Sequence, residues 1–160
     1  DSGVVISNSP DSVITDCTFY NNPAAGIYLE GSAHCSISNC DAFNNGLTGF
    51  WICCISDETS MINCHSYNNF IGVSIQKTAY VTLRNNIIHD NVYDLDIDSR
   101  YSSGYLMDFI HDIDTSNTIN GKPIYYLIEQ DNLVFDNIDT ISFLAFVSCD
   151  NITSDFDEII

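Results

Sequence analysis

Two successive stretches decide how this chain folds: GIYLEGSAHCSISNCDAFNNGLT at residues 26–48 and GFWICCISDETSMINCHSYNNFI at residues 49–71. Each begins with glycine, continues with alternating apolar residues, and reaches an Asn-Asn pair near its end. The same pattern occupies residues 3–25 before them and residues 72–93 after them, and a fifth copy begins at Asp94. An internal repeat of this length indicates that one structural unit is stacked several times.

Alternation within each repeat predicts short strands with one buried face. The paired apolar positions after each glycine are Val4 and Ile6, Ile27 and Leu29, Phe50 and Ile52, Val73 and Ile75, Leu95 and Ile97. A second apolar position falls at Ile14, Ile37, Met61 and Leu83, and the position three residues later holds Cys17, Cys40, Cys64 and Asn86. The repeats close with Asn21–Asn22, Asn44–Asn45, Asn68–Asn69 and Asp90–Asn91.

The repeat length selects the fold class. A strand–helix–strand unit needs about 30 residues or more, and strong helix formers are scarce in this chain, whereas isoleucine and asparagine are abundant. We therefore expect an all-β, single-stranded parallel β-helix whose coils contain about 23 residues and stack about 4.8 Å apart. We predict one domain over 1–160: regular coils over 1–98, an irregular insertion over 99–122 and further coils over 123–160. Because neither end resembles a cap, we expect a fragment of a longer solenoid.

Stacking predicts ladders of equivalent side chains. The Asn pairs at the turns can form hydrogen bonds with the Asn amides of the coils above and below. Each glycine that starts a coil should supply a tight bend. The extra residue of the third repeat, near Cys53–Cys54, suggests a bulge. His89 aligns with an aromatic row, which predicts stacking; the other members of this row are Tyr20, Phe43 and Tyr67.

The cysteines form part of these ladders. Because Cys17, Cys40 and Cys64 share one repeat position, their side chains point the same way, which favours buried free thiols over disulfides. No C-x-x-C spacing occurs, so a zinc site is not expected. The neighbours Cys53 and Cys54 should face opposite sides of their strand.

Charge excludes two classes of partner. The formal net charge is −18 with only 4 Lys and Arg, so the chain lacks the cationic surface that neutralises nucleic-acid phosphates. It also lacks the basic patches that bind anionic lipid, and no apolar run reaches the roughly 20 residues of a membrane span. Exposed ends of a solenoid can pair edge to edge, so a homo-oligomer through these ends is expected.

A resemblance adds to this interpretation. Residues 111–126, HDIDTSNTINGKPIYY, together with residues 146–153, FVSCDNIT, resemble segments of archaeal surface proteins with NosD-like, pectin-lyase-like β-helix repeats. The glycine-started repeats with Asn pairs are similar to the same family. The resemblance implies a right-handed helix, an extracellular or cell-surface location, and carbohydrate binding or sugar hydrolysis.

The positions between the buried ones predict where a ligand binds. One outward row contains Val5, Tyr28, Trp51, Ser74 and Asp96, and the next contains Ser7, Glu30, Cys53, Gln76 and Asp98. Flat aromatic rings beside carboxylates and amides suit a polysaccharide or glycan, so Tyr28, Trp51, Glu30, Gln76 and Asp96 are the candidate ligand-binding residues. The alternative is that a loop covers the two aromatic rings.

Asp94, Asp96 and Asp98 alternate along one strand, where they suit either calcium or a solvated acidic edge. Three functions stay open from the sequence: a carbohydrate-binding domain, a polysaccharide-degrading glycoside hydrolase or lyase, and a structural or adhesion spacer of a cell envelope. The four basic residues form no cluster that would supply a lyase base, so no catalytic residue is assigned.

Overall fold

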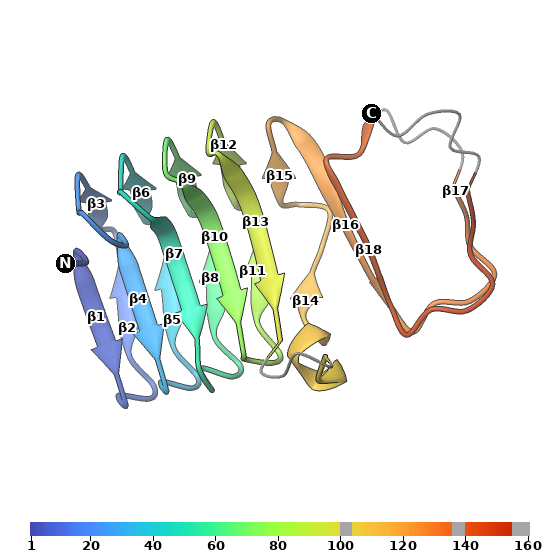
Figure 1. Ribbon diagram of the computed structural model, residues 1–160, viewed down its shortest axis with the longest axis horizontal. Helices are drawn as coiled ribbons and strands as arrows, with labels where there is room; N and C mark the ends of the chain where they lie inside the picture. The colour runs from blue at the N-terminus through green and yellow to red at the C-terminus, as the bar shows by residue number, and fades with distance from the viewer. Residues whose placement is uncertain (100–103, 136–139, 155–160) are drawn as a thin grey trace.

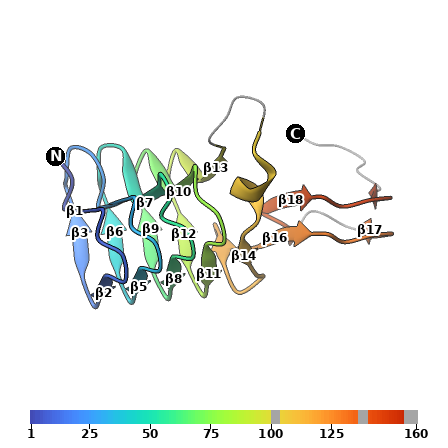
Figure 2. The same ribbon diagram turned by 90° about the horizontal axis from the view of Figure 1, so that it is seen from below.

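The chain winds into stacked coils, each built from three short strands joined by turns (Figures 1 and 2). The structure is a computed structural model that describes residues 1–99, 104–135 and 140–154. In Figure 1 the coils follow one another from β1 at the left to β13 and β15 further right. The expected all-β parallel solenoid is confirmed.

Three parallel sheets run along the stack. Sheet A contains β1 (Val4–Ser7), β4 (Ile27–Glu30), β7 (Thr48–Cys53), β10 (Ile71–Gln76) and β13 (Tyr93–Asp98). Sheet B contains β2 (Val13–Thr15), β5 (Ser36–Ser38), β8 (Ser60–Ile62), β11 (Thr82–Arg84) and β14 (Asp112–Ile113). Sheet C begins with β3 (Thr18–Tyr20), β6 (Asp41–Phe43), β9 (His65–Tyr67), β12 (Ile87–His89) and β15 (Thr118–Ile119).

The register of sheet A follows the sequence repeat. Its paired positions run Val4, Ile27, Phe50, Val73 and Leu95 from strand to strand. The inward side chains of the middle coils have no exposed surface; they include Ile27, Leu29, Phe50, Ile52, Val73 and Ile75. Full burial stabilises the folded state by about 1.5–3 kcal/mol for each such side chain, so the narrow core holds the coils together.

The two members of each Asn pair have different structural roles. The first member of each pair adopts a left-handed backbone conformation, as Asn44 does with φ 54° and Asn68 with φ 54°, which asparagine tolerates better than most residues. The second member forms a ladder of amides: Asn45 donates to Asn69 at 3.0 Å, and Asn69 donates to Asn91 at 3.1 Å. The predicted amide stacking is confirmed.

The glycines that start the coils serve close packing and not the tight bend that we expected. Their φ angles lie outside the left-handed region. A Cβ at Gly49 would lie 2.6 Å from the carbonyl oxygen of Gly72, and one at Gly26 would lie 2.7 Å from that of Gly49. Glycine is needed here because successive backbones approach too closely for a side chain.

The extra residue of the third repeat lies in a turn. β7 pairs with β10 without interruption up to Cys53 and Gln76. Cys54 and Ile55 then both adopt left-handed conformations, with φ 58° and 67°. The expected bulge is therefore absorbed after the strand ends, where Ile55 is exposed.

The segment 99–122 is only partly irregular. It contains the 3₁₀ helix η1 (Leu106–Phe109), but β14 then extends sheet B and β15 extends sheet C, so this segment completes a coil. Asn120 and Gly121, with φ 49° and 79°, form the tight turn between β15 and the antiparallel strand β16 (Lys122–Ile128). The motif at residues 111–126 thus ends the regular stack in a hairpin.

The last strands continue sheet C beyond β15 and add a separate two-stranded sheet. β16 pairs in parallel with β18 (Phe143–Val147), and β17 (Val134–Phe135) pairs in parallel with β19 (Thr153–Ser154). Figure 1 shows β16 and β18 side by side beyond β13. An amide hydrogen bond of 2.6 Å joins Asn151 to Asn132, which repeats the turn chemistry of the earlier coils.

The side-chain ladders match the repeat positions. All seven cysteines are free thiols, as expected for Cys17, Cys40 and Cys64. Their column continues as amides, because Asn86 donates to Asn117 at 2.8 Å. The aromatic row also stacks as predicted, with His89 lying 5.1 Å from Tyr67 at an interplanar angle of 5°.

Candidate functional site on the outer face of sheet A

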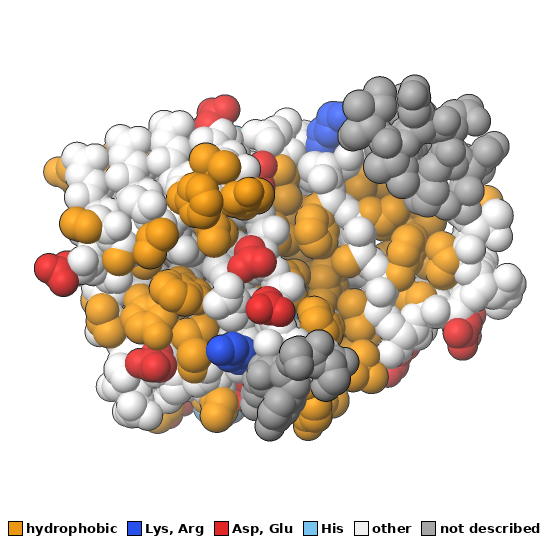
Figure 3. All heavy atoms as spheres, viewed as in Figure 1, with side chains coloured by type: hydrophobic (Ala, Val, Ile, Leu, Met, Phe, Trp, Pro, Cys, Tyr) orange, Lys and Arg blue, Asp and Glu red, His pale blue; other side chains and the backbone are white. Residues whose placement is uncertain are grey.

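Two aromatic rings lie side by side on the outer face of sheet A. Tyr28 of β4 and Trp51 of β7 are directly paired, and their ring centroids are 4.8 Å apart at an interplanar angle of 52°. Both are half-buried, because each ring covers part of the other. Figure 3 shows hydrophobic side chains gathered over β4 and β7, with acidic side chains over β13. Tyr28 and Trp51 therefore lie on the outer face of sheet A, as the repeat predicted.

A polar network occupies the next two strands of the same face. Asp96 of β13 accepts hydrogen bonds from the Ser74 hydroxyl at 3.0 Å and from the Gln76 amide at 2.8 Å, both on β10. Glu30 lies two residues after Tyr28 on β4 and accepts a 3.4 Å hydrogen bond from Ser7 of β1. The five candidate ligand-binding residues thus share the outer face of sheet A, with Tyr28 and Glu30 on β4, Trp51 on β7, Gln76 on β10 and Asp96 on β13.

A second aromatic pair, which the outward rows of the repeat did not predict, borders this network. Phe70 and Tyr93 form an edge-to-face pair with centroids 5.3 Å apart, and both rings are exposed. Together with Ile71, Leu95 and Asp96 they line a hollow of about 270 Å³. The signal was available in the sequence, because Phe70 comes directly before the paired position Ile71 and Tyr93 occupies that position in the next coil.

The three alternating aspartates do not form one group. Asp94 turns towards the Asn ladder and accepts hydrogen bonds from Asn91 and Asn120, at 3.1 and 3.0 Å. Asp96 bonds to β10 as described above, and Asp98 accepts the backbone N–H of Ser99 at 2.8 Å. Within residues 1–99, 104–135 and 140–154, no group of three or more His, Cys, Asp or Glu side chains is placed to hold a metal ion. The geometry does not bring these residues together as a calcium site would require.

Burial changes the chemistry of the aromatic pair. Burial raises the pKa of the Tyr28 hydroxyl above its ordinary value, and the hydrogen bond with Cys53 raises it further. Tyr28 therefore stays neutral, as a ring that contacts a sugar should. The Trp51 Nε1–H is buried and has no hydrogen-bond partner among the described residues.

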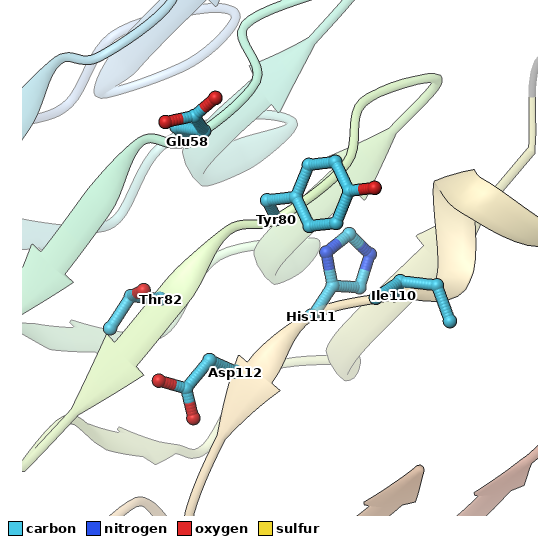
Figure 4. A pocket seen from close by; sticks show the side chains of 6 residues that line it. All are labelled: Glu58, Tyr80, Thr82, Ile110, His111 and Asp112. Atoms are coloured by element: carbon cyan, nitrogen blue, oxygen red, sulfur yellow. The ribbon is translucent and has the colours of Figure 1, made fainter. Parts of the chain in front are cut away.

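A separate hollow of about 600 Å³ lies on another part of the molecule (Figure 4). Its lining residues are Glu58, Tyr80, Thr82, Ile110, His111 and Asp112. His111 is buried and its Nδ1 accepts the backbone N–H of Val81 at 3.3 Å. Burial lowers the pKa of His111 to about 4, so the ring is neutral at physiological pH. Asp112 pairs with Arg84 at 2.5 Å, and Glu58 lies 3.3 Å from the Nδ1 atom of His34, so both carboxylates of the hollow have partners.

The comparisons with known proteins address the fold. The family described as right handed beta helix region matches residues 1–106, which is well over half of the chain. The chain belongs to the right-handed β-helix family. A search of curated proteins and a search of solved structures each found no match.

The β-helix match covers every strand of sheet A, and therefore both aromatic pairs and the Asp96 network. It ends inside η1, before β14 and the C-terminal hairpin. Among the residues that the structure describes, no helix has the length and apolar character needed to cross a membrane.

Proposed function

We propose that this β-helix binds carbohydrate on the outer face of sheet A. The observation that carries the proposal is the arrangement of two aromatic pairs, Tyr28–Trp51 and Phe70–Tyr93, around the hydrogen-bonding group of Ser74, Gln76 and Asp96. Sugar rings have apolar C–H faces and hydroxyl edges, so such a surface matches both kinds of contact.

The spacing of the strands extends this match along the sheet. Neighbouring strands lie about 4.8 Å apart, so the paired positions from Tyr28 to Asp96 form a straight track across four coils. A linear polysaccharide lying across the strands would meet an aromatic ring first and a carboxylate further on. We therefore infer that the ligand is a chain of several sugar units and not a single sugar.

Charge narrows the class of glycan. Glu30 and Asp96 lie on the face itself, and the whole chain has a formal net charge of −18. A polyanion would be repelled by this surface. We propose a neutral polysaccharide as the ligand, bound by a protein that is secreted or attached to the cell surface, in keeping with the resemblance to archaeal NosD-like surface proteins.

The experiment is a glycan array followed by titration calorimetry with the best neutral oligosaccharide. Trp51→Ala should weaken binding at least about tenfold, which corresponds to about 1.4 kcal/mol. The matched control is Tyr20→Ala, since Tyr20 is an exposed aromatic ring of the stacked row on sheet C, away from this face.

Two results would contradict the proposal. The first is an array on which the folded protein binds no glycan, which would favour a structural spacer. The second is an equal loss of glycan affinity in Trp51→Ala and Tyr20→Ala, which would show that the glycan does not bind specifically to the outer face of sheet A. Circular dichroism on both variants establishes that the coils remain folded.

A further inference from the structure

The side chains of Cys53 and Cys54 meet, although adjacent strand residues normally face opposite sides. Cys53 is the last residue of β7, and Cys54 adopts a left-handed conformation with φ 58°. This turn of the backbone brings the two Sγ atoms to 2.8 Å, within hydrogen-bond contact. The extra residue of the third repeat is therefore what creates a vicinal pair of thiols.

The two thiols differ in exposure. Cys53 is 1% exposed, whereas Cys54 is partly accessible to solvent. Burial, together with the hydrogen bond to Cys54, raises the pKa of the Cys53 thiol to about 12. Because the thiolate is the nucleophile in thiol chemistry, Cys54 is the residue that a reagent meets first and Cys53 is the one that reacts second.

The remaining cysteines have a different environment. Cys40 and Cys64 lie in the buried column and direct their Sγ atoms at backbone carbonyls, those of Ser38 and Ile62 respectively. No other two cysteine side chains among the described residues are in hydrogen-bond contact. A two-thiol reaction is thus favoured at one place in the molecule.

We propose that Cys53 and Cys54 form a dithiol oxidation site that closes to a vicinal disulfide when it meets a small-molecule disulfide. The Cys54 thiolate attacks one sulfur of the reagent, forms a mixed disulfide and expels one thiolate. Cys53 then loses its proton to solvent and attacks the Cys54 sulfur, which breaks the mixed disulfide and expels the second thiolate. Two protein thiols are oxidised, and the reagent is reduced to two thiols.

The site adjoins the aromatic face. Cys53 donates a 3.7 Å hydrogen bond to the Tyr28 hydroxyl and lies two residues from Trp51 on the same outer face of β7. Closure of the disulfide removes the S–H that Tyr28 accepts and leaves its ring without this anchor. A change in glycan binding on oxidation is a consequence that rests on the proposed function, whereas the oxidation itself does not.

The chain offers a direct optical readout. Trp51 is its single tryptophan, so any change in indole fluorescence reports on this face. A disulfide close to an indole quenches its emission. The experiment exposes the reduced protein to oxidised glutathione, follows Trp51 fluorescence, and maps the cysteines by mass spectrometry of proteolytic peptides.

The expected result is loss of two hydrogen atoms from the peptide that contains both Cys53 and Cys54, two fewer free thiols, and a fall in fluorescence. Cys53→Ser should instead retain glutathione as a stable mixed disulfide on Cys54, because the second thiol is missing. Cys54→Ser should react far more slowly than the unaltered chain. Cys35→Ser, which removes a buried thiol elsewhere in the chain, should leave the reaction unchanged.

The proposal is overturned if Cys53 and Cys54 stay reduced while other cysteines react, or if Cys53→Ser traps no glutathione. If Cys53→Ser does not fold, Cys54→Ser tests the proposal instead, because Cys54 is partly exposed in a turn. A Cys54→Ser variant that reacts as fast as the unaltered chain would then overturn the proposal. Closure of the Cys53–Cys54 disulfide in a protein that binds no glycan would overturn the glycan proposal alone, so the two inferences are tested separately.

Discussion

The side-chain amide of Gln76 donates a 2.8 Å hydrogen bond to the carboxylate of Asp96 on the next coil. Ser74 donates to the same carboxylate oxygen, so one carboxylate of β13 gathers two donors from β10. The bonds hold Asp96 close to the sheet surface and beside the hollow under Phe70 and Tyr93. A carboxylate held in this way presents its second oxygen in a defined direction, which is what a sugar hydroxyl requires.

Asp96→Asn should weaken oligosaccharide binding by about tenfold, because hydrogen bonds to charged groups contribute about 1.5–3 kcal/mol and those to neutral groups less. The stability of the fold should change by less than about 1 kcal/mol, since the amide still accepts the bond from Gln76. Calorimetric titration and urea unfolding measure the two effects. Asp41→Asn on sheet C is the control, and an equal loss of affinity there would contradict the role of Asp96.

Asn69→Ala should destabilise the fold strongly. Asn69 is buried, donates to Ala42 at 3.0 Å and Asn91 at 3.1 Å, and accepts the backbone N–H of Asn45 at 2.9 Å. Each buried group left without a partner costs about 1–3 kcal/mol, so we expect a loss of about 3 kcal/mol or more in urea unfolding. Asn68→Gly keeps the left-handed turn and should cost less than about 1 kcal/mol. Similar losses of stability in both variants would show that the amide ladder contributes no more to the free energy of unfolding than the turn residue does.

Gly49→Ala should also destabilise the stack. The new Cβ would lie 2.3 Å from the Ser66 hydroxyl and 2.6 Å from the Gly72 carbonyl oxygen, and neither coil can move without breaking its ladder. Overpacking of this kind costs about 1–3 kcal/mol. Gly104→Ala has room for its Cβ, which would meet only one ring carbon at 3.8 Å, but its φ of 72° strains an alanine, so this variant measures backbone strain without overpacking. Thermal unfolding compares them, and a smaller loss for Gly49→Ala would refute the close-packing explanation.

His111 should make stability depend on pH. Its folded pKa of about 4 lies below its ordinary pKa of 6.5, so the unfolded chain binds the proton more tightly. The contribution of neutral His111 is therefore complete above pH 6.5 and is lost as the pH falls towards 4, by about 3 kcal/mol over the full range. His111→Gln should flatten the urea-unfolding profile across this interval. An unchanged slope in His111→Gln would exclude His111 as the cause.

The repeat predicted most of the fold because stacking imposes one constraint on every coil. Once Val4, Ile27 and Phe50 are aligned, the register of sheet A and its inward and outward positions follow. The outward placement of Tyr28 and Trp51 followed for the same reason. Phe70 and Tyr93 were missed because they lie at the start of their strands, where the alternation begins and outward positions are less evident.

The directions of individual polar side chains did not follow from the pattern. Alternation placed Asp94, Asp96 and Asp98 on one face, but Asp94 turns to Asn91 and Asn120 because the Asn ladder ends beside it and offers two amide donors. The expected insertion over 99–122 proved to contain β14 and β15, since short strands of two residues carry too little alternation to be recognised.

The amino-acid sequence by itself determined the β-helix, its coil length, its buried rows and its amide, thiol and aromatic ladders, because each depends on a side chain meeting its own equivalent one coil away. Tertiary structure alone decided what depends on contacts between unlike positions. These are the contact between Cys53 and Cys54, the network around Asp96 and the hollow at His111. Such contacts are set by backbone turns and by the competition among nearby donors, which no repeat pattern records.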